Sequence, residues 1–432
     1  MLIFFINRFN DIDHMTPVIY KIVSETNEKV NVLSLNPDID IINDYRLKFL
    51  KDQYNVPINY MYKFYTPTIF YRILSNLLCY SSVRLNENNY SNMDNREKLL
   101  VLFKYFASKI FGKLLNIFSI NISKFVLRIY SKKWVKGLYN LTKPSLLIFD
   151  HASHPRLFNV AELLSVANKY SIPTIDIPHG IPLYIKHPKR WDKAKRTLVN
   201  YKKNHLVLHH RWWKKELIDF GLDQRNTPIL GSARYCSEWH NIIGDILPPD
   251  TTLENLGKDK LKIVFMDLPH YKTYNSKLNQ DLVQKISELD FVTLIVKPQT
   301  RKNKLSFSSS KNFYAAYNEN SVNLIKWADA VIVLFSSIML EILNNNTVFL
   351  YPKYMHNHQM IHEQFNVSWI LNSQQEVIDA LVKLKQKTGF KPYSQNNVNN
   401  FLRAVVYNGP NGNDVLLGYK NYIIKAKKEW GL

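Results

Sequence analysis

The sequence predicts an α/β protein with two Rossmann-like, doubly wound domains that face a cleft. In both halves of the chain, short apolar segments typical of buried parallel strands alternate with helical patterns. Residues 244–260 are rich in Pro, Asp and Gly and separate the two series. We therefore predict a first domain at 1–245, a second at 260–410, and a C-terminal helix at 411–432 that packs back on the first.

The first domain opens with a buried strand at residues 2–6. Thr16 and Pro17 are typical of the N-cap and first turn of a helix, and another strand follows at 30–35. No Gly-x-Gly-x-x-Gly pattern follows the first strand, which argues against a dinucleotide fingerprint. The remaining strands of this domain are predicted at residues 145–149, 174–177, 206–208 and 228–230.

Residues 60–140 interrupt this alternation and predict a basic helical insertion. Lys and Arg lie among Phe, Leu and Ile over residues 99–140. Two packed helices with a solvated lysine face explain the pattern, and the alternative is a surface that rests on anionic lipid head groups.

The second domain repeats the strand–helix order, and Ser373 with Glu376 predicts a capping box for a helix that ends at Leu384. No run of roughly 18 uncharged apolar residues occurs, so no membrane-spanning helix is expected. The apolar run at the start is too short for a signal peptide. The strands of this domain are predicted at residues 262–266, 292–296, 330–335 and 347–351.

The composition narrows the class of protein. The 432 residues are 46% hydrophobic and 21% charged, close to a soluble globular average, which excludes a mainly disordered, collagenous or coiled-coil chain. The net charge of +22 predicts an anionic partner, which is acidic lipid, nucleic acid or a phosphorylated small molecule. Two cysteines cannot build a disulfide framework, so nothing in the sequence indicates an oxidising compartment.

Polar side chains follow several predicted strands, at the edge where doubly wound sheets bind ligands. Asp150 and His151 follow one strand, and His179 with Gly180 follows another. A carboxylate or imidazole at a strand end is well placed as a general base, and a glycine lets the backbone turn sharply. The alternatives are a helix-capping Asp150 and a structural His179.

Two further strand ends predict a site for an anion. Ser232 is placed to cap the next helix, and Arg234 to hold a phosphate or carboxylate with its guanidinium fork. Ser336 and Ser337 lie at a predicted helix N-terminus, where hydroxyl and backbone N–H groups bind anions. Glu341 lies one turn later and is placed to accept hydrogen bonds from ribose hydroxyls. A well-capped helix and an ordinary turn are the alternatives.

The remaining candidates lie on two other strand ends. Lys297, Gln299 and Arg301 form a cationic loop after one strand, and His356 follows another. Solvated polar loops explain these residues equally well. The sequence predicts no metal site, because Asp150, His151 and His154 form a single short cluster of possible ligands without further carboxylates.

Together these residues resemble the bacterial surface-polysaccharide glycosyltransferases of the GT-B fold, a group that includes CDP-glycerol glycerophosphotransferases, capsule Kdo-transferases and bacterial sialyltransferases. Residues 328–352 resemble their C-terminal signature, and residues 179–183 resemble their HG-x-P-L element. Residues 231–235 resemble their G-x-P-R turn, with Ala233 in place of Pro. Lys297-Pro298-Gln299 falls where the group carries a His-Pro pair. The resemblance covers residues 145–360.

The resemblance implies transfer of a sugar from a nucleotide-activated donor to a hydroxyl of a capsule, lipopolysaccharide or teichoic-acid type glycan, with inversion. The donor phosphate would lie on Ser336 and Ser337, with positive charge from the loop after residue 296 and no cofactor or essential metal. His179 is the first candidate for the base, before Asp150 and His151. CMP-linked acidic sugars are favoured over CDP- and UDP-linked donors. An anionic or lipid-linked glycan acceptor and a cytoplasmic location at the inner membrane face are expected.

Three other functions stay open. A nucleotide-sugar epimerase of the same architecture would change its sugar without an acceptor. A non-enzymatic polyanion- or nucleic-acid-binding protein agrees with the charge of +22, the 26 Tyr and the 8 Trp. The sequence has no helix-turn-helix, RNP or zinc-finger signature, so no nucleic acid partner is expected. An inactive scaffold in a polysaccharide assembly complex is the third.

Overall fold

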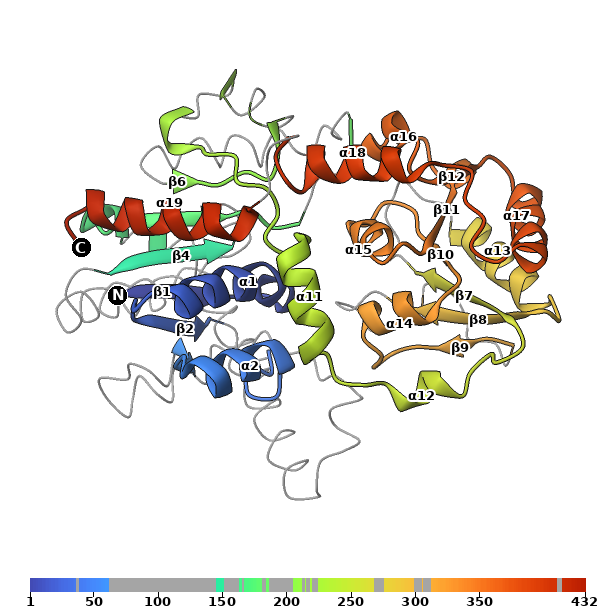
Figure 1. Cartoon of the computed structure of the whole chain (residues 1–432), viewed down its shortest axis with the longest axis horizontal. Helices are drawn as coiled ribbons and strands as arrows, with labels where there is room; N and C mark the ends of the chain where they lie inside the picture. Colours follow the sequence, from blue (N-terminus) through green and yellow to red (C-terminus); the bar gives the residue numbers. More distant parts are fainter. Residues whose placement is uncertain are drawn as a thin grey trace, which may run out of the picture. The chain divides into compact units, whose positions relative to one another are not determined.

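In the computed structural model the chain forms two compact units, unit 1 and unit 2 (Figure 1). Unit 1 comprises Met1–His179, Trp191–Arg234 and Asp414–Leu432, and unit 2 comprises Gly180–Arg190 and Tyr235–Asn413. Most of the predicted insertion, including its basic helices, lies outside the described residues. The structure describes residues 1–35, 39–61, 145–150, 163–164, 167–180, 184–185, 205–211, 214, 218–219, 224–267, 276–298, 305, 312–409 and 414–432.

Unit 1 contains a six-stranded parallel sheet with the order β3-β2-β1-β4-β5-β6. The strand order reverses between β1 and β4, which makes that point the topological switch at which such sheets bind ligands. Both of these strands are buried along their whole length, which is why they are almost entirely apolar. The strands are β1 (Leu2–Ile6), β2 (Val30–Ser34), β3 (Ile58–Tyr60), β4 (Leu146–Asp150), β5 (Thr174–Ile177) and β6 (His205–Leu206).

The predicted strand at 228–230 is reduced to an isolated bridge between Leu208 and Ile229. The strand predicted at 206–208 corresponds to β6, which ends at Leu206. The other predicted strands of the first domain are confirmed to within a residue or two.

Helix α1 (Phe9–Glu25) begins well before Thr16 and Pro17, so the predicted helix start at those two residues is wrong. The helix begins earlier than predicted because the side chain of Asp11 caps its N-terminus. The Asp11 carboxylate accepts the two backbone N–H groups that precede the helix, at 2.8 and 2.9 Å. This extension of the helix places Asp11 and His14 on α1, next to the carboxyl end of β1.

Helix α19 (Val415–Glu429) belongs to unit 1 and packs beside α1, as the red and blue helices of Figure 1 show. Two ion pairs join it to the end of α1 and the loop after it: Lys420 with Glu25 at 2.7 Å, and Lys427 with Glu28 at 2.6 Å. Within the described residues of this unit, helix α2 (Tyr45–Tyr54) is capped by the side chain of the preceding aspartate.

Unit 2 contains a second six-stranded parallel sheet with the order β12-β11-β10-β7-β8-β9. Its switch point lies between β10 and β7. The core of this unit is formed by the apolar faces of these strands and of α13 and α17. The strands are β7 (Leu261–Met266), β8 (Val292–Lys297), β9 (Tyr314–Ala315), β10 (Ala330–Ile332), β11 (Val348–Pro352) and β12 (Trp369–Leu371).

The N-cap predicted at Ser373 is confirmed, because its Oγ accepts the backbone N–H of Glu376 at 3.1 Å. The Glu376 carboxylate accepts the backbone N–H of Asn372 at 2.8 Å, so the reciprocal bond of a capping box goes to the residue before the cap. The helix runs two residues beyond the predicted end. No helix among the described residues is both long and apolar enough to cross a bilayer. The helices of unit 2 are α11 (Ser237–Ile246), α12 (Thr251–Glu254), α13 (Ser276–Ser287), α14 (Ser321–Trp327), α15 (Met339–Asn344), α16 (Ile361–Phe365), α17 (Gln374–Gln386) and α18 (Gln395–Val405).

The chain passes from unit 1 to unit 2 between Arg234 and Tyr235, earlier than the predicted boundary at 245. Tyr235 is tied to unit 2 by two hydrogen bonds. Its hydroxyl donates to Ser337 Oγ at 3.0 Å, and its carbonyl accepts from the Asn344 side chain at 2.9 Å. The Pro- and Gly-rich segment that suggested the boundary is therefore an internal connection of unit 2, between α11 and β7.

Candidate active site

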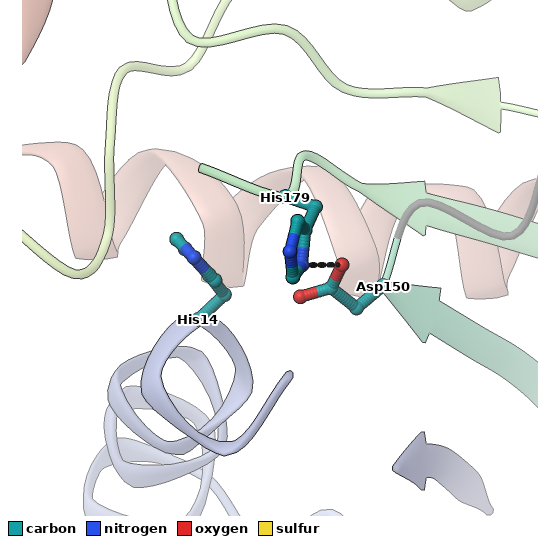
Figure 2. A group of neighbouring side chains, drawn as sticks. All are labelled: His14, Asp150 and His179. Atoms are coloured by element: carbon teal, nitrogen blue, oxygen red, sulfur yellow. Dashed lines mark hydrogen bonds and ion pairs between the residues drawn. The ribbon is translucent and has the colours of Figure 1, made fainter. Parts of the chain in front are cut away.

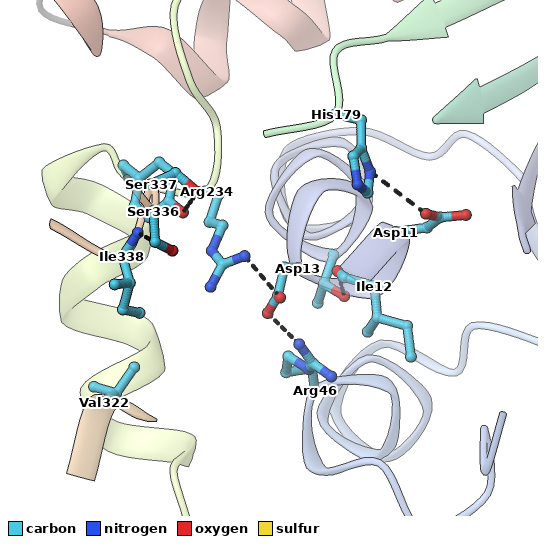
Figure 3. Close-up of polar contacts among 12 residues, drawn as sticks. Asp11, Ile12, Asp13, Arg46, His179, Arg234, Val322, Ser336, Ser337 and Ile338 are labelled. Atoms are coloured by element: carbon cyan, nitrogen blue, oxygen red, sulfur yellow. Dashed lines mark hydrogen bonds and ion pairs between the residues drawn. The ribbon is translucent and has the colours of Figure 1, made fainter. Parts of the chain in front are cut away.

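Four side chains of unit 1, Asp11, His14, Asp150 and His179, gather at the carboxyl end of its sheet, and we call them the acid–base cluster. Figure 2 shows the last three, and Figure 3 shows Asp11 beside His179. Asp150 is the last residue of β4, and His179 lies two residues beyond β5. Asp11 and His14 project from α1, where a spacing of three residues puts both on one face. The cluster lies beside the switch point of the sheet, where ligands of this architecture bind.

Nδ1 of His179 faces two carboxylates. Its Nδ1 lies 2.7 Å from Asp150 Oδ1 and 3.6 Å from Asp11 Oδ1. The imidazole of His14 lies 5.3 Å from that of His179 and 6.4 Å from that of His209, measured between ring centroids. The His179 side chain keeps 14% of its surface exposed, whereas both carboxylates are buried. The strand-end candidates Asp150 and His179 are thus brought into direct contact.

Burial controls the protonation of this cluster. Burial, with the charge of Asp150, raises the pKa of Asp11 to about 7, although the positive charge of His179 and two backbone N–H bonds oppose the rise. Burial also lowers the pKa of His14 well below its ordinary value, and the charges of His179 and Arg234 add to that effect. Asp11 can therefore gain or lose a proton near neutral pH, while His14 stays neutral.

A chain of ion pairs borders the cluster (Figure 3). Arg234 donates to Asp13 at 2.8 Å, and Arg46 bonds both Asp13 and Asp44. Arg46 is buried and its pKa is raised, because the charges of the two aspartates outweigh the cost of burial. The structure thus gives Arg234 a carboxylate of its own unit as a partner, and a contact with a ligand phosphate would compete with Asp13.

Gly180 and Ser232, two further candidates from the sequence, have different surroundings. Gly180 has a φ of +61°, the left-handed conformation that favours glycine, and this agrees with a sharp turn directly after His179. Ser232 is fully buried. The expectation that it caps the next helix is wrong, because α11 begins at Ser237 with Cys236 as its N-cap residue. His151 lies outside the described residues.

In unit 2, Ser336 and Ser337 lie in the loop between β10 and α15 (Figure 3). Ser337 Oγ accepts the Tyr235 hydroxyl at 3.0 Å, and Ser336 Oγ accepts the backbone N–H of Ile338 at 3.4 Å. A serine hydroxyl that accepts a bond keeps its own proton to donate. The helix itself begins only at Met339, two residues later than predicted.

Glu341 and Lys297 are buried inside unit 2. The Glu341 carboxylate lies 3.7 Å from His240 Nδ1. Lys297 Nζ donates to the carbonyl of Tyr317 at 3.1 Å, and burial lowers its pKa to about 8 against the opposing charge of Glu319. Both side chains already have partners inside the unit. Gln299 and Arg301 lie outside the described residues.

His356 is buried and uses both ring nitrogens within unit 2. Its Nε2 lies 3.0 Å from the Tyr351 hydroxyl, and its Nδ1 accepts the backbone N–H of His358 at 3.1 Å. The Tyr351 hydroxyl donates in turn to Glu363, so Nε2 carries the imidazole proton. Burial lowers the pKa of His356 to about 4, with help from the charges of Lys353 and His358. A direct contact with a donor would require these bonds to break.

Sequence reasoning missed four members of the site: Asp11, His14, Asp13 and Arg46. A signal was present in the sequence, since Asp-Ile-Asp-His follows the first strand within a few residues. This segment precedes the helix start predicted at Thr16 and Pro17, so it was not interpreted as part of a helix. Of the two partners of Arg46, Asp44 is two residues away, whereas Asp13 is 33 residues earlier in the chain and could not be identified from the local sequence.

One group of side chains within the described residues could hold a metal ion. His14, Asp150 and His179 each offer one ligand atom, and these atoms lie within 4.8 Å of one another. The residues for which the sequence suggested a metal role were Asp150, His151 and His154, of which only Asp150 is described, and His14 was not among them.

No family model and no curated protein sequence matches this chain, whereas solved structures do. The UDP-GlcNAc 2-epimerase from Neisseria meningitidis, bound to UDP-GlcNAc, has a TM-score of 0.56 at 8% identity and covers 99% of each chain. The enzyme of that name from Methanocaldococcus jannaschii has a TM-score of 0.56 at 11% identity, with 99% of each chain covered. MnaA of S. aureus, in a co-structure with UDP, gives 0.56 at 10% identity over 99% of this chain and 96% of that chain.

At sequence identities this low, the structural similarity shows only that the fold is shared. The predicted architecture of two Rossmann-like domains, of the GT-B kind, is confirmed by the two parallel sheets and by these neighbours. The narrower group of CDP-glycerol-, Kdo- and sialic-acid-transferring enzymes is not supported by them.

Proposed function

We propose that this chain acts on a nucleotide-activated sugar and transfers the sugar to a hydroxyl group of a glycan. The observation behind the proposal is the 2.7 Å hydrogen bond between His179 and Asp150 at the ends of two adjacent parallel strands. The carboxylate accepts the proton of Nδ1 and orients the ring, which leaves the lone pair of Nε2 to act as a base. A partly exposed imidazole held in this way suits removal of a proton from a hydroxyl.

The proposed reaction is a single displacement. Nε2 of His179 takes the proton of the acceptor hydroxyl as its oxygen forms a bond to the anomeric carbon. The bond between that carbon and the phosphate oxygen breaks, and the nucleotide leaves with the electron pair. Asp150 stabilises the imidazolium that forms. This path inverts the anomeric centre.

We further propose that the departing phosphate is bound by unit 2. Ser336 and Ser337 accept hydrogen bonds from protein donors, so both hydroxyl protons are available to a phosphate oxygen. Hydroxyl and backbone donors of this kind supply charge stabilisation without a metal ion, and we keep the prediction that none is essential. The net charge of +22 supports an anionic acceptor, a glycan or lipid-linked glycan, at the inner face of the plasma membrane.

Epimerisation of a nucleotide sugar is the second candidate, and the structural neighbours favour it over a transferase specific for CMP-linked sugars. The three structures cited above are named for 2-epimerisation of UDP-GlcNAc or were solved with UDP. We therefore place UDP-linked donors before the CMP-linked donors that the sequence favoured. The acid–base cluster suits this reaction too, because epimerisation at a carbon that bears hydrogen requires a base to remove that hydrogen and an acid to return one.

One experiment separates the two candidates. The protein is incubated in D2O and EDTA with UDP-, CMP-, CDP- or GDP-linked sugars, with and without acidic oligosaccharide acceptors. A transferase releases nucleotide only when an acceptor is present and leaves the remaining donor free of deuterium. An epimerase incorporates deuterium into the sugar carbon that it inverts, with no acceptor present.

The same experiment exposes the remaining possibilities. Activity that requires added Mg²⁺ or Mn²⁺ would contradict the metal-independent mechanism. If no nucleotide sugar is turned over and none raises the unfolding temperature, while heparin does, the proposed function is wrong. The chain would then be a polyanion-binding protein.

A further inference from the structure

We propose that the acid–base cluster of unit 1 is also a binding site for a divalent transition metal of the Zn²⁺ class, and that the bound metal switches the enzyme off. The binding stands on the geometry of the cluster. The inhibition rests on the proposed function, because it requires His179 to be the base.

Three side chains supply the first ligands. One atom from each of His14, Asp150 and His179 lies within 4.8 Å of the other two (Figure 2). In a tetrahedral site with bonds of about 2.1 Å, ligand atoms are about 3.4 Å apart. The widest separation must therefore shorten by about 1.4 Å, a movement that two side chains can share. Their backbones are fixed on α1, on β4 and just after β5, so the ligands converge from three sides.

Asp11 supplies a fourth oxygen and an independent observation. Its Oδ1 is buried, has no hydrogen-bond partner among the described residues, and lies 3.6 Å from Nδ1 of His179. Its Oδ2 accepts two backbone N–H groups at 2.8 and 2.9 Å. Such bonds orient the carboxylates of metal sites. A buried oxygen that is oriented in this way and lacks a donor is what a cation would satisfy.

The charges around the cluster favour a divalent cation. Asp11 and Asp150 provide two carboxylates, and burial favours the neutral, metal-binding form of His14. The nearby cations Arg46 and Arg234 are balanced by two aspartates, Asp13 and Asp44, and add no net charge. Two imidazoles with two carboxylates form a ligand set that Zn²⁺ and Co²⁺ accept, whereas Mg²⁺ and Ca²⁺ prefer oxygen ligands alone.

Metal binding and base catalysis exclude each other at His179. Coordination through Nε2 removes the lone pair that would accept the acceptor proton. Coordination through Nδ1 removes the hydrogen bond to Asp150 that orients the ring. Either way the base is lost for as long as the metal is bound, and a chelator restores it.

The binding is tested without any nucleotide. The full chain is freed of metal with EDTA, desalted, and titrated with Zn²⁺ by calorimetry, and Co²⁺ is added separately to record its visible d–d absorption. We expect one tight site and a Co²⁺ band typical of four-coordinate geometry. His14→Asn should weaken Zn²⁺ binding more than tenfold. Mutation of a residue that only hydrogen-bonds to a metal ligand already lowers metal affinity 10- to 100-fold, and His14 is itself a proposed ligand. His205→Asn, the same change on β6 of the same unit, should bind like the parent.

A second variant and an activity assay with Zn²⁺ distinguish failure of the metal site from failure of the proposed function. Asp150→Asn is close in shape to the parent and should also lose the site, which covers the case in which His14→Asn fails to fold. Equal Zn²⁺ affinity in the parent and both folded variants, or no stoichiometric binding, would overturn the site. Zn²⁺ that binds as expected but does not inhibit sugar transfer would overturn the inhibition. A chain that binds Zn²⁺ as expected but turns over no nucleotide sugar would leave the site standing and remove the proposed function.

Discussion

His179 of unit 1 and the two histidines His356 and His362 of unit 2 have opposite surroundings. Nδ1 of His179 faces two carboxylates, and the side chain keeps part of its surface exposed. In unit 2, His356 has both nitrogens bonded, and His362 is fully buried, with its ring centroid 5.3 Å from that of Phe349 and 4.5 Å from that of Tyr351. Neighbouring groups therefore decide whether an imidazole takes part in chemistry. Carboxylates prepare it to accept a proton, whereas aromatic rings and burial hold it neutral.

The largest effect is expected when the base of unit 1 is removed. His179→Ala should lower turnover by about 10²- to 10⁴-fold, the usual contribution of a general base, with little change in donor affinity. His362→Phe, a buried histidine of unit 2 replaced by a ring of similar shape, is the control and should retain turnover. Steady-state kinetics with the donor that the experiment in D2O identifies provide the measurement. Full activity in His179→Ala would show that the base lies elsewhere.

The histidines of unit 2 should instead control stability in acid. Burial lowers the pKa of His362 to about 3, below the unfolded value of about 6.5. The unfolded chain therefore binds this proton first, and stability is lost as the pH falls below 6.5. Between pH 7 and pH 5 the loss from His362 alone should be about 2 kcal/mol. Urea unfolding at both pH values measures it.

His362→Phe should reduce that acid-induced loss by the same amount. His356 adds a similar pH dependence to the free energy of unfolding, because its pKa of about 4 also lies below the unfolded value. A parent protein and a His362→Phe variant with identical pH dependence would show that His362 is protonated, or exposed, in the folded state.

A smaller effect is expected at the loop of unit 2 that contains Ser336 and Ser337. Tyr235→Phe removes the hydroxyl that donates to Ser337 Oγ. A hydrogen bond of this kind contributes about 0.5–1.5 kcal/mol, so donor KM should rise about 2- to 13-fold. Turnover at saturating donor should change little. Tyr393→Phe, which removes a hydroxyl that accepts the backbone N–H of Phe349 in β11, is the matched control. An unchanged KM in Tyr235→Phe would show that Ser337 does not contribute to donor binding.

The smallest effect is expected at the turn after His179. Gly180→Ala forces a Cβ into a left-handed conformation, which costs about 1 kcal/mol. Apart from the glycine and its two chain neighbours, no atom of the described residues lies within 4 Å of the added Cβ, so the cost is conformational and not steric. Denaturant unfolding should show the loss. A variant as stable as the parent would mean that the turn relaxes to another conformation.

The sequence predicted the fold well because its signals are local. Continuous apolar runs such as β1 and β4 identify parallel strands wherever they occur. The start of α1 was missed because Thr16 and Pro17 resemble a cap, while the actual cap is the side chain of Asp11.

The candidate site was predicted only in part, for a related reason. Position at a strand end identified Asp150 and His179, but the contact of His179 with Asp11 joins residues far apart in the chain. The same limit applies to His356, whose place after a strand suggested a ligand contact. Only its packing shows that both of its nitrogens are already bonded within unit 2.

The ion pairs between α19 and the end of α1 also bear on how the protein is made. They join residues 395 and 399 positions apart, because Tyr235–Asn413 of unit 2 precede the last of the three segments of unit 1. During synthesis, α19 therefore leaves the ribosome after the described strands of the unit 1 sheet and after all of unit 2. Unit 1, which carries the acid–base cluster, is complete only when α19 has been made. A nascent chain stalled before α19 would lack the two ion pairs that join this helix to Glu25 and Glu28.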